Sequence, residues 1–268
     1  MSYQIQGNAA PATGASLREL VQERRVAHGG WCMIGNAFAT EIVSASGCEW
    51  VCLDLQHGLI GDEAMRLMVQ AAAIRSVPVA VRVPWNEPAG IMRALDAGAG
   101  GVIVPMVNTA EDARDAVAAT RYPPQGYRSW GPLRSLLADA AFDPARGNEQ
   151  SVCIVMVETV EAFGNLEAIL SVPGVDSVLV GPNDLAISHA GENTGAGRSE
   201  QDVAMIREIA AACERHGKAA GISCGDGAEA RRYEGMGYTL LGLPADAALI
   251  GAGMAATLAD ARQGATHE

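Results

Sequence analysis

Short apolar runs alternate with helix-like segments along almost the whole chain after Leu17. The runs with strand character cover residues 31–36, 50–55, 78–83, 101–106, 151–157, 177–181, 218–223 and 239–243. The segments with helical periodicity cover residues 61–76, 87–97, 109–119, 160–170, 200–216, 226–236 and 245–262. Runs of valine, isoleucine and leucine without polar alternation are typical of strands buried on both faces of a parallel sheet.

This alternation predicts an α/β fold of eight strand–helix units, which a (β/α)8 TIM barrel accommodates in a chain of 268 residues. A doubly wound open sheet is the alternative. No Gly-x-Gly-x-x-Gly turn follows the first run, which argues against a sheet that binds NAD. Residues 1–15 are polar and rich in small residues, so we expect a flexible N-terminal arm there and a single barrel domain over residues 16–268.

The longest connection covers residues 121–150 and begins Arg-Tyr-Pro-Pro-Gln-Gly, so it cannot start as regular structure. We expect it to cross one end of the barrel. Its Tyr127, Arg128 and Trp130 either form part of a substrate mouth or only pack the loop.

The composition excludes several classes of protein. The net charge of −12 argues against a nucleic-acid partner, although a small anionic substrate responds to local charge. The six cysteines form no Cys-x-x-Cys pair, and no apolar run approaches membrane-spanning length. We therefore expect a cytoplasmic protein with free thiols and no membrane contact.

Three of the apolar runs end in side chains that can do chemistry. Asp54 and His57 follow the second run, Glu158 follows the fifth, and Asp184 follows the sixth. The carboxyl ends of parallel strands are where α/β folds build active sites. Glu158 and Asp184 can therefore converge on one hard divalent cation, with water or substrate oxygens as the other ligands. The alternative is that Glu158 caps its own helix and Asp184 begins the next one.

A turn that can hold a carboxylate beside this metal consists of Gly181, Pro182, Asn183 and Asp184, because it exposes backbone N–H groups. His57 is placed to act as a general base near pH 7 in its neutral form. A single histidine at a strand end is nevertheless more often structural than catalytic.

Arg82 ends the third run, inside an otherwise apolar segment where a charge is costly unless it is paired. It either faces a substrate oxyanion or bridges Asp96 or another buried acid. Lys218 is the only lysine and begins the seventh run, at the wrong end of a barrel for a Schiff base. A barrel enzyme of this composition that acts on carbonyl carbons must therefore stabilise an enolate with a metal and an arginine.

Six segments between about residues 28 and 260 together resemble the HpcH/HpaI aldolase family, which includes 4-hydroxy-2-oxoheptanedioate aldolase and 2-dehydro-3-deoxyglucarate aldolase. The segments are Asp54-Leu-Gln-His57-Gly58, Val81-Arg82-Val-Pro-Trp85, Val104-Pro-Met-Val107, Arg121-Tyr-Pro-Pro-Gln-Gly126, Val157-Glu158-Thr-Val-Glu161 and Gly181-Pro-Asn-Asp184-Leu185. The resemblance implies a (β/α)8 barrel whose last helix packs on a neighbouring subunit, in a homohexamer built as a trimer of dimers.

The reaction that the resemblance implies is reversible cleavage of a 4-hydroxy-2-oxo acid to pyruvate, or hydroxypyruvate, and an aldehyde. It implies Mg²⁺, Mn²⁺ or Co²⁺ as the cofactor, without PLP, NAD or a Schiff-base lysine. The metal ligands would be Glu158 and Asp184, and His57 would be the base, with Asp96 raising its basicity. Arg82 would stabilise the enolate oxygen.

The resemblance also implies how the substrate is held. Backbone N–H groups around Asn183 and Asp184 would bind the pyruvate carboxylate, and Asp54 and Gln56 would support the site. Three positions depart from common members of the family and leave the aldehyde partner open: Gln56 replaces a glutamate, Met156 replaces a substrate-contacting glutamine of some members, and Ser223 stands where an apolar residue can line the aldehyde pocket.

Three functions are therefore compared. The first is a metal-dependent pyruvate aldolase. The second is an acyl-CoA lyase of the malyl-CoA or citrate lyase type on the same barrel, for which no clear basic or adenine-binding groove is visible in the sequence. The third is a non-catalytic protein that binds keto acids, which would bind pyruvate without exchanging its methyl protons.

Overall fold

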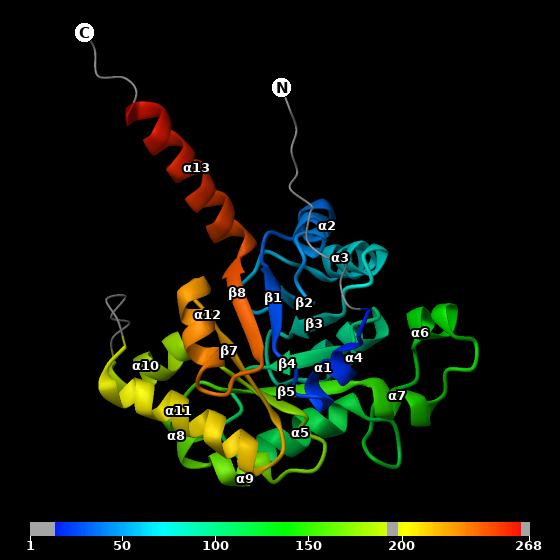
Figure 1. The fold of residues 1–268 in the computed structure, drawn as a ribbon. Helices are drawn as coiled ribbons and strands as arrows, with labels where there is room; N and C mark the ends of the chain where they lie inside the picture. The colour runs from blue at the N-terminus through cyan, green and yellow to red at the C-terminus, as the bar shows by residue number, and fades with distance from the viewer. Residues whose placement is uncertain (1–13, 192–197, 264–268) are drawn as a thin grey trace.

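The computed structural model describes residues 14–191 and 198–263, and its central feature is a closed barrel of parallel strands in sequence order (Figure 1). The strands are β1 (Ala27–Cys32), β2 (Trp50–Asp54), β3 (Val79–Arg82), β4 (Gly101–Val104), β5 (Val152–Val157), β6 (Ser177–Val180), β7 (Ala219–Ser223) and β8 (Leu240–Ala245). Strand β8 pairs in parallel with β1 and closes the barrel. The (β/α)8 prediction is confirmed.

Helices surround the barrel, and some connections contain two or three of them. They are α1 (Leu17–Gln22), α2 (Ala37–Ala45), α3 (Asp62–Ile74), α4 (Pro88–Asp96), α5 (Ala110–Thr120), α6 (Leu133–Ala138), α7 (Pro144–Gln150), α8 (Val160–Gly164), α9 (Leu166–Leu170), α10 (Pro182–Ala190), α11 (Glu200–Arg215), α12 (Gly227–Glu234) and α13 (Asp246–Gln263). No helix among the described residues is long and apolar enough to cross a membrane.

Alternate residues of each strand enter two separate cores. In β2, Val51 and Leu53 belong to the core between strands and helices, whereas Trp50 and Cys52 belong to the core that fills the barrel. This division follows from the period of two along a strand. Helix α1 contributes Leu17 to the second core, so it closes the barrel at the end where the strands begin.

The prediction for the first strand, residues 31–36, was wrong by about four positions, since β1 covers Ala27–Cys32. Gly29 weakens the strand pattern of this segment in the sequence, because glycine has no side chain that favours a strand. A Cβ at Gly29 would lie 2.2 Å from Cε2 of Trp50, so the indole on the neighbouring strand requires glycine there. The strand register, with Gly29 opposite Trp50, makes this contact unavoidable.

The connection over residues 121–150 is a packed segment that contains α6 and α7. It joins the end of α5 to the start of β5, so it lies where the strands begin, away from their carboxyl ends. Arg128 is buried against the ring of Tyr122, with 4.6 Å between its Cζ and the ring centroid. Trp130 contacts the same ring at 5.2 Å between centroids. Within this chain, Arg128 and Trp130 therefore pack the connection and do not form part of a substrate mouth.

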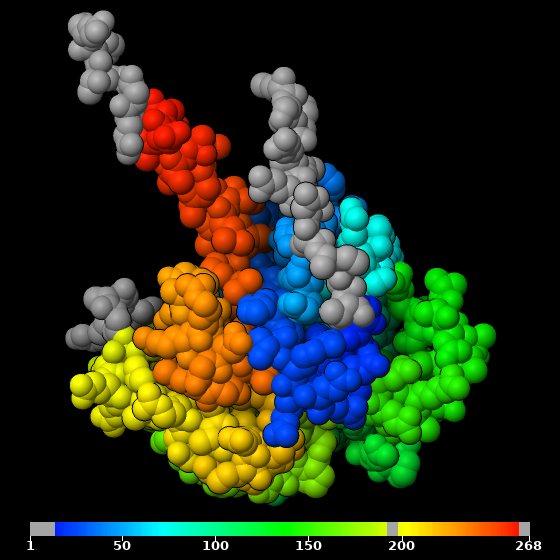
Figure 2. All heavy atoms as spheres, viewed as in Figure 1, coloured from blue at the N-terminus to red at the C-terminus, as the bar shows by residue number. Residues whose placement is uncertain are grey.

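Helix α13 extends away from the barrel (Figures 1 and 2). Its first residue, Asp246, is buried, whereas its described side chains are exposed from Ala247 on. Four large apolar side chains on it are at least 44% exposed, namely Leu249, Ile250, Met254 and Leu258. The predicted N-terminal arm, residues 1–15, lies outside the described residues except for its last two positions.

Candidate active site

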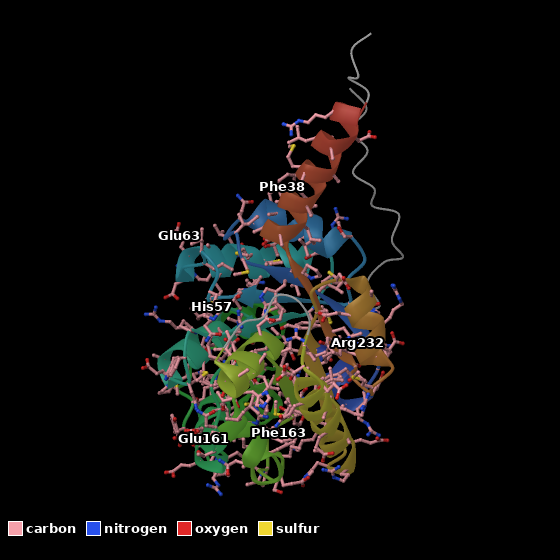
Figure 3. All side chains as sticks on the ribbon, turned by 90° about the vertical axis from the view of Figure 1, so that its left-hand side faces the viewer. Phe38, His57, Glu63, Glu161, Phe163 and Arg232 are labelled. Atoms are coloured by element: carbon pink, nitrogen blue, oxygen red, sulfur yellow. The ribbon has the colours of Figure 1, made fainter. Side chains whose placement is uncertain are left out.

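A cavity of about 290 Å³ opens at the carboxyl ends of the strands. It is lined by residues in the last positions of β1, β3, β7 and β8 or just after β1, β2, β6 and β7: Trp31, Met33, His57, Arg82, Gly181, Pro182, Asn183, Asp184, Ser223, Cys224, Leu243, Pro244 and Ala245. Most of the side chains that the sequence singled out therefore meet at one place. His57 lies in the loop between β2 and α3 and is exposed (Figure 3).

Asp54 is fully buried at the end of β2 and organises one side of the cavity. Its Oδ1 accepts hydrogen bonds from the backbone N–H groups of Gln56 at 3.0 Å and His57 at 3.1 Å, which fixes the turn that carries the imidazole. Its Oδ2 accepts the indole N–H of Trp31 at 3.1 Å. Gly58 completes the turn, because a Cβ there would lie 2.2 Å from the Asp54 carbonyl oxygen.

Arg82 is paired with Asp54 and not with Asp96. Its Nε donates to Oδ1 of Asp54 at 2.9 Å and its Nη2 to Oδ2 at 2.5 Å, a bidentate pair between residues that are register partners in β2 and β3. The guanidinium also lies 5.1 Å from the ring centroid of Trp31. Nη1 has no hydrogen-bond acceptor among the described residues, so one donor stays free beside the cavity.

These contacts hold Asp54 in its charged form. Burial opposes ionisation, but the hydrogen bonds and charge of Arg82 outweigh it, and the pKa of Asp54 lies below its ordinary value. The side chain of Arg82 is thus fixed in orientation by an acid that stays charged. Both functions proposed for Arg82 in the sequence, bridging a core acid and facing a substrate, are compatible with this arrangement.

Glu158 is buried at the end of β5, with 2% of its surface exposed. Its Oε1 accepts the backbone N–H of Met106 at 2.7 Å, whereas Oε2 has no donor among the described residues. Burial raises the pKa of Glu158; the Met106 N–H and Arg82 lower it in part, and the nearby Asp184 carboxylate adds to the rise. A buried carboxylate with so few partners is costly unless a positive charge compensates it, which indicates a binding site for a cation.

Met106 was not identified from the sequence as a functional residue. Its backbone has φ 55°, a left-handed conformation that a long side chain rarely adopts. The conformation points its N–H at Glu158. Observed strain of this kind is often concentrated at functional sites. Met106 belongs to the segment Val104-Pro-Met-Val107, which contributed to the family resemblance. Nothing in that segment predicts a positive φ at Met106.

Gly181 allows the turn after β6 to approach Glu158 closely. A Cβ on Gly181 would lie 2.7 Å from Oε2 of Glu158. The turn leads into α10, where Asp184 is exposed at the cavity wall. Helix α10 has no side-chain cap, so its first N–H groups, including those of Asn183 and Asp184, lack intrahelical acceptors and are available to an anion.

Glu158 and Asp184 are suited to hold a hard divalent cation, since Asp184 lines the cavity and Glu158 lies behind Gly181 in the same wall. The pKa of Glu158 is raised mainly by burial, and the charge of Asp184 adds to the rise. No cluster of three or more His, Cys, Asp or Glu side chains with metal-binding geometry exists among the described residues. Two protein ligands leave the other coordination positions to water or substrate oxygens, as Mg²⁺ sites commonly do.

Asp96 is not brought to His57 within this chain. It ends α4, at the end of the barrel where the strands begin, and its Oδ1 accepts a hydrogen bond from Nη2 of Arg128 at 2.7 Å. A helix that follows a barrel strand returns toward the start of the next strand, which carries Asp96 away from the cavity. The predicted partnership of Asp96 with His57 is therefore absent inside one chain, and Asp54 is the acid that contacts the His57 turn.

The three positions that departed from the family pattern have different surroundings. Ser223 lines the cavity as predicted. Met156 does not line the cavity. It precedes Glu158 by two positions, lies in the barrel core and is 1% exposed. Gln56 is partly buried, and its Oε1 has no hydrogen-bond partner among the described residues. The structure also adds Trp31 and Cys224 to the cavity wall, two residues that the sequence did not single out.

Lys218 lies just before β7, at the end of the barrel opposite the cavity, and donates a hydrogen bond to the carbonyl of Val175. Burial lowers its pKa. Its position agrees with the prediction that the only lysine lies far from the carboxyl ends of the strands.

The chain is similar to known proteins in both sequence and fold. Residues 29–246 match the HpcH/HpaI aldolase/citrate lyase family. A hydroxypyruvate/pyruvate aldolase of Rhizorhabdus wittichii is 36% identical over 92% of this chain and 98% of its own length. A 5-keto-4-deoxy-D-glucarate aldolase of Klebsiella pneumoniae is 38% identical over 81% of this chain and 85% of its own. A crystal structure of a Burkholderia cenocepacia protein of the HpcH/HpaI aldolase/citrate lyase family superposes with a TM-score of 0.82 at 30% identity, over 92% of this chain and 98% of that one.

Proposed function

Because the chain belongs to the HpcH/HpaI aldolase/citrate lyase family, we propose that it is a divalent-metal aldolase. The reaction is reversible cleavage of a 4-hydroxy-2-oxo acid to pyruvate, or hydroxypyruvate, and an aldehyde. The observation that carries the proposal is the buried carboxylate of Glu158, which has few partners of its own and lies directly behind Gly181. Gly181 lines the cavity together with Asp184, Arg82 and His57.

Each side chain at the cavity has a task that its surroundings support. The free Nη1 of Arg82 faces the place where negative charge develops on the keto oxygen of the substrate, and Asp54 prevents the guanidinium from turning away. The exposed imidazole of His57 accepts or returns the proton of the 4-hydroxyl group. The first N–H groups of α10 hold the substrate carboxylate.

Glu158 and Asp184 would hold the cation, for which Mg²⁺, Mn²⁺ and Co²⁺ all suit oxygen ligands. When bound, a divalent cation polarises the keto group and so makes the adjacent methyl protons acidic. Lys218 takes no part in this chemistry because it lies at the other end of the barrel.

Proton exchange at the methyl group of pyruvate tests this function without knowledge of the aldehyde. With Mg²⁺ in heavy water, the protein is expected to exchange these protons, followed by proton NMR, and EDTA is expected to stop the exchange. A panel of aldehydes with pyruvate or hydroxypyruvate, read by product mass, then identifies the partner. Tight pyruvate binding without exchange would contradict the proposal and favour a sensor, whereas cleavage of malyl-CoA would favour the acyl-CoA lyase.

The proposed assembly is a homohexamer, a trimer of dimers in which α13 packs on a neighbouring subunit. Its support is the apolar surface of α13, which has no covering element in its own chain among the described residues. A groove of about 320 Å³ beside the start of α13 is lined by apolar groups that include Trp31, Val43 and Cys48. Light scattering after gel filtration is expected to give six times the chain mass, and Ile250→Asp is expected to reduce it.

The proposed location is the cytoplasm. All six cysteines are free and buried, as expected in a reducing compartment. Titration of the unfolded protein with a thiol reagent, after purification without reductant, is expected to find six thiols per chain, and fewer would contradict the proposal.

A further inference from the structure

Arg198 lies just before α11, next to its cap Ser199, and reaches across to the turn that carries Asp184. Its Nη1 donates to the carbonyl oxygen of Pro182 at 2.7 Å, and its Nη2 lies 3.4 Å from Oδ1 of Asn183. The guanidinium is largely buried, with 13% of the side chain exposed. A partly buried arginine with its donors engaged is held in one orientation.

The turn from Gly181 to Asp184 needs an external support. Its glycine is the start of α10 and forms no side-chain cap, and Asn183 and Asp184 are exposed. Among the described residues, Arg198 is the only side chain that donates a hydrogen bond to this turn. The position of the Asp184 carboxylate relative to Glu158 therefore depends on a residue that does not itself line the cavity.

The same guanidinium is fixed from the opposite side by α12. Nε of Arg198 donates to the hydroxyl oxygen of Tyr233 at 2.9 Å, and Tyr233 is fully buried. The Tyr233 hydroxyl donates to Oε1 of Glu229 at 3.3 Å, and Glu229 forms a longer ion pair with Arg198 at 3.9 Å. Arg232, labelled in Figure 3, marks this helix and places its guanidinium over the Tyr233 ring, at 5.3 Å from the ring centroid.

Glu229 extends this network to the second wall of the cavity. Its Oε2 accepts the backbone N–H of Gly225 at 2.7 Å. Gly225 directly follows Ser223 and Cys224, both of which line the cavity. Through Arg198, Tyr233 and Glu229, the turn after β6 is thus tied to the loop after β7.

We propose that Arg198 is a positioning residue that holds the Asp184 turn and couples it to the Ser223–Cys224 loop. The inference rests on the proposed metal aldolase function and concerns the support of that site. Groups that orient metal ligands without touching the metal commonly change metal affinity or activity by about 10- to 100-fold when they are removed. Displacement of a reacting group by about 1 Å has a comparable effect on rate.

The test compares Arg198→Met with Arg207→Met, an exposed arginine on α11 that has no contact with the cavity. Mn²⁺ affinity is measured from the signal of free Mn²⁺ by electron paramagnetic resonance, together with Tm and with kcat and KM for pyruvate formation. Arg198→Met is expected to weaken Mn²⁺ binding by about tenfold or more and to lower kcat, whereas Arg207→Met matches the wild type.

Two milder variants keep the test decisive if Arg198→Met does not fold. Arg198→Lys retains one donor for the Pro182 carbonyl and is expected to restore part of the Mn²⁺ affinity. Tyr233→Phe removes only the hydroxyl that holds Nε and is expected to weaken affinity by a smaller factor. Folded Arg198→Lys and Tyr233→Phe proteins with wild-type Mn²⁺ affinity and kcat would overturn the inference.

The wild-type protein separates the two proposals. If it binds Mn²⁺ and exchanges pyruvate protons while the variants match it, only the role of Arg198 is wrong. If the wild type itself neither binds Mn²⁺ nor exchanges protons, the aldolase proposal fails and the inference fails with it.

Discussion

Each end of the barrel holds a carboxylate that is shielded from water, Asp176 mostly and Glu158 almost fully, but the two carboxylates have different partners. At the end where the strands begin, Asp176 accepts hydrogen bonds from both Arg18 and Arg121 and from the backbone N–H of Cys153 at 2.8 Å. At the carboxyl ends, Glu158 accepts one hydrogen bond from the described residues, that of the Met106 N–H, and burial raises its pKa. A buried charge is stabilised when it is paired and is costly when it is not.

This difference distinguishes structural from functional burial of charge. Asp176 links α1, Arg121 and β5, and two arginines compensate its charge. Glu158 has no hydrogen bond to a positively charged group among the described residues, as the proposed cation site requires. The contrast predicts that removing the Asp176 charge harms stability while removing the Glu158 charge harms function.

The largest effect is expected from Glu158→Gln. Loss of one of the two proposed metal ligands should lower kcat/KM by about 10³-fold or more, which corresponds to about 4 kcal/mol. Stability should stay the same or rise, because the variant no longer buries a poorly paired charge. Kinetics and thermal melts, with and without Mn²⁺, check both parts, and Mn²⁺ should raise the Tm of the wild type only.

Glu161→Gln is the matched control, since Glu161 lies three residues later on the exposed side of α8 (Figure 3). It should leave kcat/KM and Tm near their wild-type values. Equal activity of the Glu158 and Glu161 variants would remove the basis of the proposed site.

Asp176→Asn is expected to have the next largest effect, on stability. It leaves Arg18 and Arg121 without their shared charge, which should lower the free energy of unfolding by about 3 kcal/mol. Urea denaturation measures the loss, and kcat per folded molecule should not change. Asp139→Asn breaks an exposed pair with Arg146 instead and should cost less than about 1 kcal/mol.

Asp54→Asn should destabilise the protein by about 2 kcal/mol near neutral pH, because it removes the charged partner of buried Arg82. The pKa of Asp54 is depressed in the fold, so its contribution is fully present above the unfolded value of about 4 and is lost as the pH falls through the folded value. Urea midpoints of wild type and variant should therefore differ constantly above about pH 5 and converge below about pH 4. A difference that grows on acidification would contradict the assigned direction.

The smallest effect is expected from Lys218→Met, which alters the end of the barrel opposite the cavity. Its half-buried ammonium donates to the carbonyl of Val175 and interacts electrostatically with Asp176, which keeps its two arginines, so stability should change by about 1 kcal/mol or less. kcat/KM should not change, and borohydride in the presence of pyruvate should leave no mass adduct on the wild type. Loss of activity or a trapped adduct would replace the metal mechanism with a Schiff base.

The barrel could be predicted from the sequence because its signal is local. Valine-rich runs such as 151–157 are apolar on both faces and are found as β5 at Val152–Val157. The grouping of Glu158, Asp184 and His57 was predictable for the same reason, since parallel strands deliver their carboxyl ends to one rim. The first strand was misplaced because Gly29 is set by the Trp50 ring, a contact that strand propensity does not contain.

Only the tertiary structure decided which charged side chains form pairs. The sequence offered Asp96 as a partner for Arg82 or His57, yet the register of β2 and β3 sets Asp54 beside Arg82, and the return of α4 carries Asp96 to the other end. The positive φ of Met106 accompanies a hydrogen bond from its N–H to Glu158, a residue 52 positions away in the chain. Apolar periodicity is a property of neighbouring residues, so the sequence alone determines the strands and where they end. The pairing of charges depends on strand register and helix direction, which exist only once the barrel has closed.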